Sequence, residues 1–126
     1  MVADEARPSK QIHNFWDLEV WKRSHQLVLR IYEVTKRFPA HEKFGLTSQI
    51  RRAAVSIPAN IAEGFRKRGK KDKANYYNIA HASLEEVRYY LLFAKDLEYL
   101  RNVKDEWKIT EEISKMLTAL AKWFHP

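Results

Sequence analysis

The stretch RRAAVSIPANIAEGFRKRGKKDK, residues 51–73, combines a helical apolar pattern, an internal proline and a run of cations. Apolar residues recur every three or four positions through it and just before it, which is typical of one face of a helix. They are Leu46, Ile50, Ala53, Ala54, Ile57, Ile61 and Phe65. The stretch therefore predicts a helix over about residues 42–65 that turns this face toward a core.

A second face of the same predicted helix also lacks charge. It contains Val55, Pro58, Ala59 and Ala62, with Gly64 at its end. Because small residues let another backbone come close, we expect this face to form an interface between copies of the chain. The alternative is that the alanines only raise helix propensity on an exposed surface.

A polar stripe separates the two apolar faces and includes Ser56, Asn60 and Glu63. Pro58 removes the hydrogen bond to the Ala54 carbonyl and should bend the helix, which leaves that carbonyl in need of a donor. Buried polar groups are hydrogen-bonded and can fix how helices pack. We therefore expect the stripe to be a structural network and not a catalytic site.

Three further helices are predicted, over about residues 17–37, 72–100 and 105–124. In the first, the 3,4-spaced row that we expect to be buried is Leu18, Trp21, His25, Val28, Tyr32 and Thr35, widened by Leu27, Ile31 and Val34. Asp17 and Asp72 are the expected N-caps, and Asn102 the expected C-terminal residue of the third helix. Residues 1–14 lack periodicity and are predicted to be a flexible tail. The fold class is therefore all-α, and residues 15–126 are expected to form an antiparallel up-down-up-down four-helix bundle.

Composition narrows the class of protein. The chain has 126 residues, 45% of them hydrophobic, and no cysteine. It therefore has no disulfides, thiolate zinc sites or cysteine nucleophile, which fits a cytoplasmic protein. No signal peptide or membrane-spanning run is visible, so we expect a globular protein without a membrane partner.

Positive charge is concentrated in one part of the chain. The net charge is +7 overall. Residues 30–73 hold 12 Lys and Arg against 4 Asp and Glu, whereas the other residues hold 11 against 12. Such asymmetry favours a polyanionic partner, although a surface that keeps the protein in solution would show it too.

The cations cluster most densely after Gly64. The expected contacts to nucleic-acid phosphates are Arg51, Arg52, Arg66, Lys67, Arg68, Lys70, Lys71 and Lys73. An exposed Tyr77 could stack on a base, and Tyr76 is expected in the core. A solubilising loop is the alternative interpretation of the same run.

Motifs for catalysis or cofactor binding are missing. The sequence has no Glu-x-x-His pair, no H-E-x-x-H and no glycine-rich phosphate loop, and its histidines lack ligand spacing. His25 and His81 are expected to be hydrogen-bonded core histidines. We therefore expect no enzyme, no cofactor and no metal.

Three segments carry a family resemblance: FWDLEVWKRSHQLVLRIYEVTKRFP (15–39), EKFGLTSQIRRAAVSIPANIAEG (42–64) and YNIAHASLEEVRYYLLFAKDLEYL (77–100). The chain resembles the four-helix-bundle proteins encoded in intervening sequences of large-subunit ribosomal RNA genes. That family is similar to the accessory variability protein of diversity-generating retroelements, a basic homopentamer that binds nucleic acid and a reverse transcriptase. One departure is Ala82, where the family often has Gly.

The resemblance implies a homo-oligomer, expected to be a pentamer, with a nucleic-acid-associated role and no known catalytic activity. The expected partners are therefore other copies of the chain, RNA or DNA, and a reverse transcriptase or other protein. The alternative function is a protein–protein interaction scaffold that does not bind nucleic acid.

Overall fold

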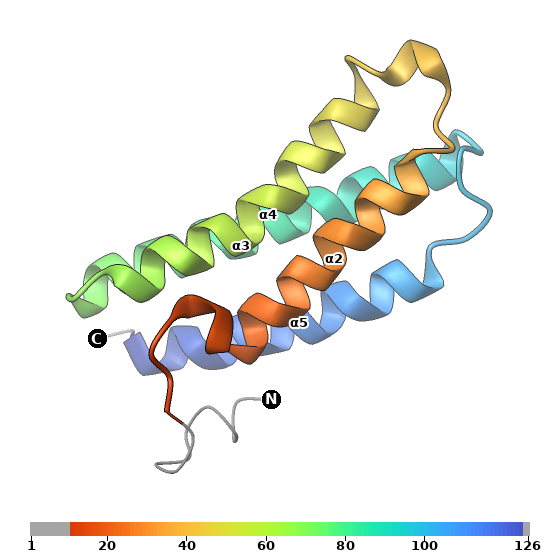
Figure 1. Ribbon diagram of the computed structural model, residues 1–126. Coiled ribbons are helices and arrows are strands. Elements are labelled where there is room, and N and C mark those ends of the chain that lie inside the picture. The colour runs from red at the N-terminus through yellow and green to blue at the C-terminus, as the bar shows by residue number, and fades with distance from the viewer. Residues whose placement is uncertain (1–10, 125–126) are drawn as a thin grey trace.

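A computed structural model of the protein describes residues 11–124 and contains four α-helices and no strand within that range (Figure 1). The helices are α2 (Glu19–Thr35), α3 (Leu46–Arg66), α4 (Lys70–Asp96) and α5 (Lys104–Phe124). Two short 3₁₀ turns, η1 (Phe15–Asp17) and η2 (Ala40–Glu42), precede α2 and α3. The all-α prediction is confirmed.

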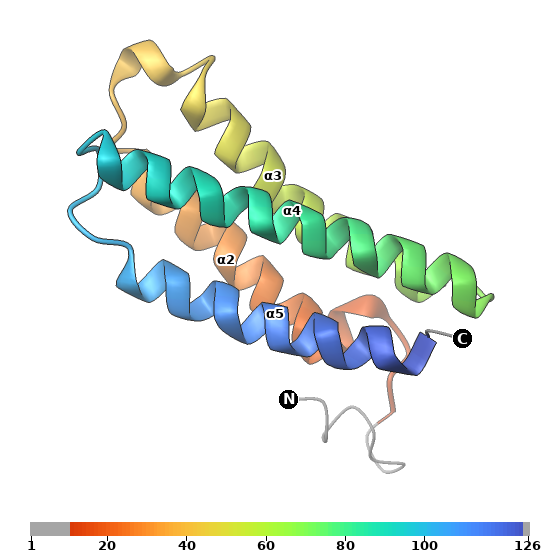
Figure 2. The same cartoon turned by 180° about the vertical axis from the view of Figure 1, so that it is seen from behind.

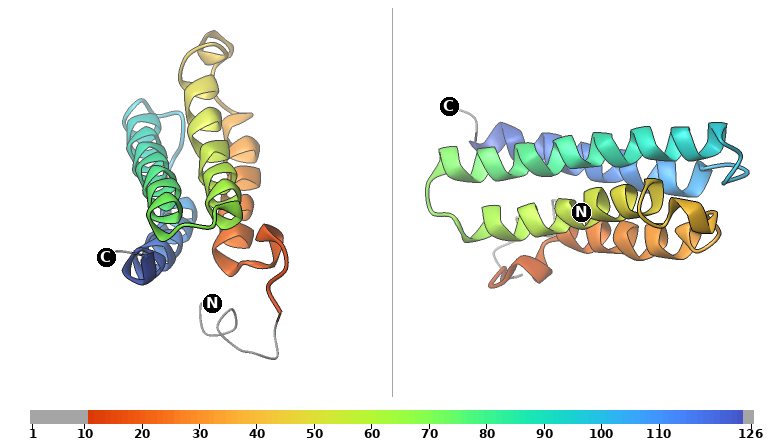
Figure 3. Two further views of the ribbon diagram at one scale, coloured as in Figure 1. Left: turned by 90° about the vertical axis from the view of Figure 1, so that its left-hand side faces the viewer. Right: turned by 90° about the horizontal axis from the view of Figure 1, so that it is seen from above.

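Each long helix contacts two others, so the four helices enclose one core. α2 packs against α3 and α5, and α4 packs against the same two helices (Figures 2 and 3). Large aliphatic side chains from all four are fully buried between them: Leu27, Ile31, Ile50, Ile57, Ile61, Leu84, Leu91, Ile113 and Leu117. Burial of each such side chain contributes about 1.5–3 kcal/mol, which makes this core the main source of stability.

The buried face of α2 agrees only in part with the predicted one. It contains Val20, Ser24, Leu27, Ile31 and Val34, and Val28 and Thr35 of the predicted row are also buried. Trp21 is only partly buried, while His25 and Tyr32 are exposed, and the ring of His25 stacks on that of Trp21 at 5.0 Å. The predicted core role of His25 is therefore wrong, because a row one position away along the helix has the same spacing and faces the core.

The segment before α2 makes hydrogen bonds and a core contact. Asp17 accepts hydrogen bonds from the backbone amides of His13 and Asn14, at 3.1 and 3.0 Å, and these bonds lower its pKa. Ile12 packs against the core. Of the tail predicted to be flexible, residues 12–14 thus have contacts to the rest of the chain, and residues 1–10 lie outside the described range. Asp17 closes η1, and Leu18, not Asp17, occupies the N-cap position of α2.

α3 begins four residues later than predicted, because η2 and Gly45 precede it. The carboxylate of Glu42 accepts hydrogen bonds from the backbone amide of Leu46, at 3.1 Å, and from the hydroxyl of Tyr99, at 2.8 Å. These two bonds, that of the Leu46 amide first, lower the pKa of Glu42. Glu42 therefore ties the start of α3 to the segment that follows α4.

Glu42 should make stability depend on pH. A carboxyl group whose pKa is lower in the folded chain stabilises the fold above its unfolded pKa and loses that effect as pH falls through the folded value. The free energy of unfolding should therefore decrease as pH falls from about 5 to about 3. Glu42→Gln should show a smaller decrease in urea unfolding over this range. Glu111→Gln, at an exposed position on α5, should behave like the wild-type chain, and identical profiles for all three would contradict this role.

α4 runs from Lys70 to Asp96, so it starts two residues before the predicted range and ends four residues before its end. Gly69, not Asp72, is its N-cap. The chain leaves α4 through Glu98, whose φ is 65°, and the side chain of Asn102 accepts a hydrogen bond from the Lys104 amide at 3.2 Å. Asn102 therefore starts α5 and does not end α4.

Pro58 lies inside α3, and the helix changes direction where its colour turns from yellow to green (Figure 1). This agrees with the predicted bend. Within residues 11–124 no helix combines the length and the apolar character that crossing a bilayer requires.

Candidate nucleic-acid interface

The densest group of cations occupies the connection between α3 and α4. Arg66 ends α3, Gly69 precedes α4, and Lys70 starts it. The exposed cations here are Arg66, Lys67, Arg68, Lys70 and Lys71, and they are called the cationic turn below. No ion pair within residues 11–124 involves any of them, so all five charges remain available to a polyanion.

Some of the other basic residues between positions 30 and 73 are paired within the fold. Arg30 lies 2.7 Å from the buried carboxylate of Glu106, which raises the pKa of the guanidinium. Lys36 lies 3.1 Å from Glu33. Ion pairs within the fold therefore neutralise part of the positive charge of residues 30–73. The cations that remain without an ion pair among the described residues lie mainly in the cationic turn.

Lys73 has a different role from the one predicted. Its ammonium donates hydrogen bonds to the carbonyls of Gly64 and Phe65, at 3.1 and 2.7 Å, and burial lowers its pKa. It also lies over the rings of Phe65 and Phe124. Lys73 thus satisfies carbonyls at the end of α3, which lack an intrahelical partner, so its ammonium is less available to a phosphate than the exposed cations are.

Arg51 and Arg52 do not join the cationic turn. Arg51 donates hydrogen bonds to the Thr35 hydroxyl at 2.8 Å and to the Tyr32 carbonyl at 3.3 Å, and its guanidinium lies 4.5 Å from the centre of the Tyr32 ring. Arg51 therefore ties α3 to α2. Arg52 is exposed, but it lies roughly 20 Å along the helix from Lys67 at 1.5 Å per residue.

The burial of the two tyrosines near the cationic turn is the reverse of the predicted one. Tyr77 is only 4% exposed and belongs to the core, whereas Tyr76 is partly exposed and has the ammonium of Lys67 5.2 Å from its ring centre. The prediction of a base-stacking Tyr77 is therefore wrong, because Tyr77 packs inward against the end of α3.

The predicted polar network exists and joins α3 to α4. The hydroxyls of Ser56 and Ser83 are 2.8 Å apart, and the amide of Asn60 donates to the carbonyl and the hydroxyl of Ser56, at 2.8 and 3.0 Å. The side chain of Glu63 is exposed, and its carboxylate makes no hydrogen bond or ion pair within residues 11–124. The stripe is thus structural at Ser56 and Asn60, but Glu63 is not part of the network.

The predicted second face of α3 is smaller than expected. Val55 is 42% exposed, Ala59 is exposed and Ala62 is partly exposed. Pro58 and Gly64 are buried. A Cβ atom at Gly64 would lie 2.8 Å from a ring carbon of Tyr77, so the glycine permits close contact with α4. Pro58 and Gly64 therefore pack within the chain, as a structural motif would, which leaves Val55, Ala59 and Ala62 as the accessible part of this face.

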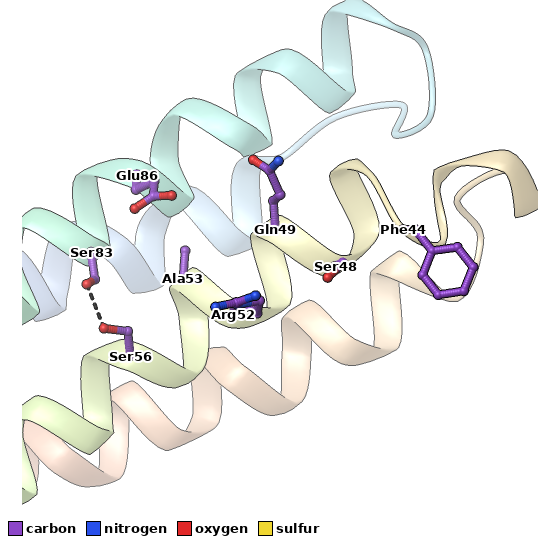
Figure 4. Close-up of a pocket in the computed structure, with 8 residues that line it drawn as sticks. All are labelled: Phe44, Ser48, Gln49, Arg52, Ala53, Ser56, Ser83 and Glu86. Carbon is purple, nitrogen blue, oxygen red and sulfur yellow. Dashed lines mark hydrogen bonds between the residues drawn. The ribbon is translucent and has the colours of Figure 1, made fainter.

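Two hollows of the described surface lie along α3 and α4, next to residues considered above. A cleft of about 460 Å³ lies between α3 and α4, and Arg52, Gln49 and Glu86 line it near the hydrogen bond between Ser56 and Ser83 (Figure 4). The exposed ring of Phe44 stands at its other end (Figure 4). This lining mixes both signs of charge, so the cleft is less suited to a polyanion than the cationic turn.

The other hollow is a groove of about 890 Å³ beside the cationic turn, and sequence reasoning did not find it. It is lined by Lys70, Lys71, Asp72, Asn75, Asn78 and Phe124. The sequence pattern that could have indicated it is Lys71, Asn75 and Asn78, which are spaced so as to lie on one side of a helix. Nothing in the sequence places Phe124 beside the start of α4.

The described residues offer no metal centre. Within residues 11–124, no three His, Asp or Glu side chains lie close enough together to share an ion. His81 lies 2.9 Å from the Ser114 hydroxyl, as expected of a hydrogen-bonded histidine. The chemistry that these surfaces provide is therefore cationic and aromatic contact.

Comparison with known proteins adds two similarities. The sequence model of a family described as 23S rRNA-intervening sequence proteins matches residues 16–119. The chain is also similar to a solved crystal structure, a protein of unknown function from the S23 ribosomal protein family of Bacteroides thetaiotaomicron. The two are 28% identical with a TM-score of 0.75, and the similarity covers 82% of this chain and 98% of that one. No curated protein matches the sequence significantly.

Proposed function

Because the chain belongs to the family of 23S rRNA-intervening sequence proteins, we propose that it is a non-enzymatic protein that binds nucleic acid through its cationic turn. One observation carries the proposal: five exposed cations lie in six consecutive positions, residues 66–71, with no ion pair among the described residues. A compact group of this kind suits phosphate contacts, which position a nucleic acid without reading its sequence. The family's name makes RNA the first nucleic acid to test.

The salt dependence of binding tests this proposal. If the five cations contact phosphates, the logarithm of the association constant should fall with the logarithm of salt concentration with a slope of about −3.5 to −4.5 per chain. Fluorescence anisotropy with a labelled 23S rRNA fragment, titrated at about 50 to 200 mM salt, measures this slope. Binding that is absent at low salt, or indifferent to salt, would contradict the proposal.

The architecture included in the proposal is an antiparallel up-down-up-down bundle that assembles into a homo-oligomer, with a pentamer as the expected form. The ring of contacts α2–α3–α4–α5–α2 supports the bundle. The exposed small residues Val55 and Ala59 support self-association, because another helix could approach closely there. Assembly would repeat the cationic turn, and several weak contacts to one nucleic acid would then act together.

A single added charge on this face should disrupt assembly. Val55→Glu should shift the mass measured by light scattering at micromolar concentration from a multiple of the chain to that of one chain, because a buried carboxylate without a partner is strongly unfavourable. Gln26→Glu adds the same charge at an exposed position of α2 and should leave the mass unchanged. A wild-type chain that is monomeric under these conditions would refute self-association.

Recruitment of a protein is the second candidate function. Exposed apolar side chains follow the outer part of α4: Tyr89, Leu92, Phe93 and Leu97. The rings of Tyr89 and Phe93 stack with centres 6.0 Å apart, so they form one apolar patch. A reverse transcriptase is the first partner to test. Capture of a protein after nuclease treatment, without affinity of the purified chain for nucleic acid, would favour this function over the first.

A further inference from the structure

The groove beside the cationic turn has the size and the lining to hold one nucleotide. Its volume of about 890 Å³ falls within the range of about 300–1,000 Å³ that small-molecule pockets occupy. Its lining residues come from the first turns of α4 and the last turn of α5. These two segments lie at the same end of the molecule as the connection between α3 and α4 (Figure 1). A strand held by the turn could therefore extend into it.

The polar side chains in the groove can bind the phosphate and the hydrogen-bonding edge of the base of a nucleotide. Lys70 and Lys71 are exposed cations that could contact a phosphate. Asn75 and Asn78 are three residues apart on α4 and so lie on one side of the helix. Each amide offers two donors and an acceptor, which can match the edge of a base, and neither is hydrogen-bonded within residues 11–124. Asp72 could accept a hydrogen bond from an exocyclic amino group of the base.

Phe124 gives the groove an aromatic surface, and the ring packs against neighbouring side chains that fix its position. Its ring centre lies 5.7 Å from that of the buried Tyr77, and the ammonium of Lys73 lies 6.0 Å from it. Because Lys73 is itself bonded to the end of α3, the ring position is coupled to the cationic turn. A ring fixed in this way can stack on a base without further ordering.

From this juxtaposition we propose that the groove binds an unpaired nucleotide, so that the protein prefers single-stranded to duplex nucleic acid. In a duplex, bases are stacked on each other and paired at their edges, so neither Phe124 nor the two asparagines could engage them. The inference rests on the proposed function and adds the form of nucleic acid that is bound.

Anisotropy titrations with a labelled 12-nucleotide single strand and with its duplex, at one salt concentration, test the inference. The wild-type chain should bind the single strand about tenfold more tightly, since stacking of one base contributes that order of affinity. N75A/N78A and F124L should each remove most of this difference and leave duplex affinity unchanged. F124L keeps an apolar side chain at the position, and thermal unfolding monitored by circular dichroism verifies that it folds.

A matched control is E111A/K115A, which changes two exposed residues of α5 without changing net charge and should bind like the wild-type chain. Equal, salt-dependent binding of strand and duplex, or variants that keep the full preference, would overturn the inference and leave the proposed function standing. Absence of salt-dependent binding to either probe would overturn the proposed function itself.

Discussion

A variant that lacks four cations of the turn between α3 and α4 is expected to bind RNA at least about a hundredfold more weakly than the wild-type chain at about 0.1 M salt. The substitutions are K67Q, R68Q, K70Q and K71Q. Each lost phosphate contact should also make the salt slope less negative by about one, so the slope should change by about three to four. Fold stability should change little, because all four side chains are exposed.

A control variant distinguishes the loss of charge at the cationic turn from an equal loss of net charge elsewhere on the protein. The control removes four exposed cations from the far end of α4, the connection that follows it and the start of α5: K95Q, R101Q, K104Q and K108Q. Residues 95–108 contain four basic and four acidic side chains, so they form no cationic patch. Both variants have the same net charge, and only the first should lose affinity. Equal losses would show that net charge, and not the cationic turn, determines binding.

The helices could be predicted because their apolar periodicity extends over many turns, but their ends could not be placed as well. Ends depend on single contacts: the Glu42 carboxylate bonds the Leu46 amide, and Asn102 bonds the amide of Lys104. In α2 two neighbouring rows have the same spacing. Only the packed chain shows that Ser24 is buried while His25, one position later, is exposed.

The cationic turn could be predicted because its charges are adjacent in the sequence. The exception is Lys73, whose part in the fold depends on reaching carbonyls eight and nine residues earlier. The groove could not be predicted at all, because it brings Phe124 beside Asn75 and Asn78 through the packing of α5 on α4. Local patterns thus identify charge, whereas the shape around that charge depends on tertiary contacts.

Gly64 connects that tertiary packing with the cationic turn, and Gly64→Ala should therefore lower both stability and affinity. The new methyl group would lie 2.8 Å and 3.1 Å from ring carbons of the buried Tyr77 and 3.0 Å from the Cβ of Tyr76. Crowding of this kind should reduce the free energy of unfolding by about 1–3 kcal/mol, although alanine favours the helix by about 1 kcal/mol. Urea unfolding measures the change.

Gly69→Ala makes the same chemical change within the turn itself. Its φ is −82°, which alanine adopts readily, and the nearest atom to its new methyl group, in Asp72, would be 4.0 Å away. Its unfolding free energy should therefore stay within about 0.5 kcal/mol of the wild-type value. If Gly64→Ala also leaves the free energy unchanged, α3 and α4 do not pack as closely as described. If it lowers stability and RNA affinity together while Gly69→Ala lowers neither, the close contact at Gly64 is what holds the cationic turn in its binding position.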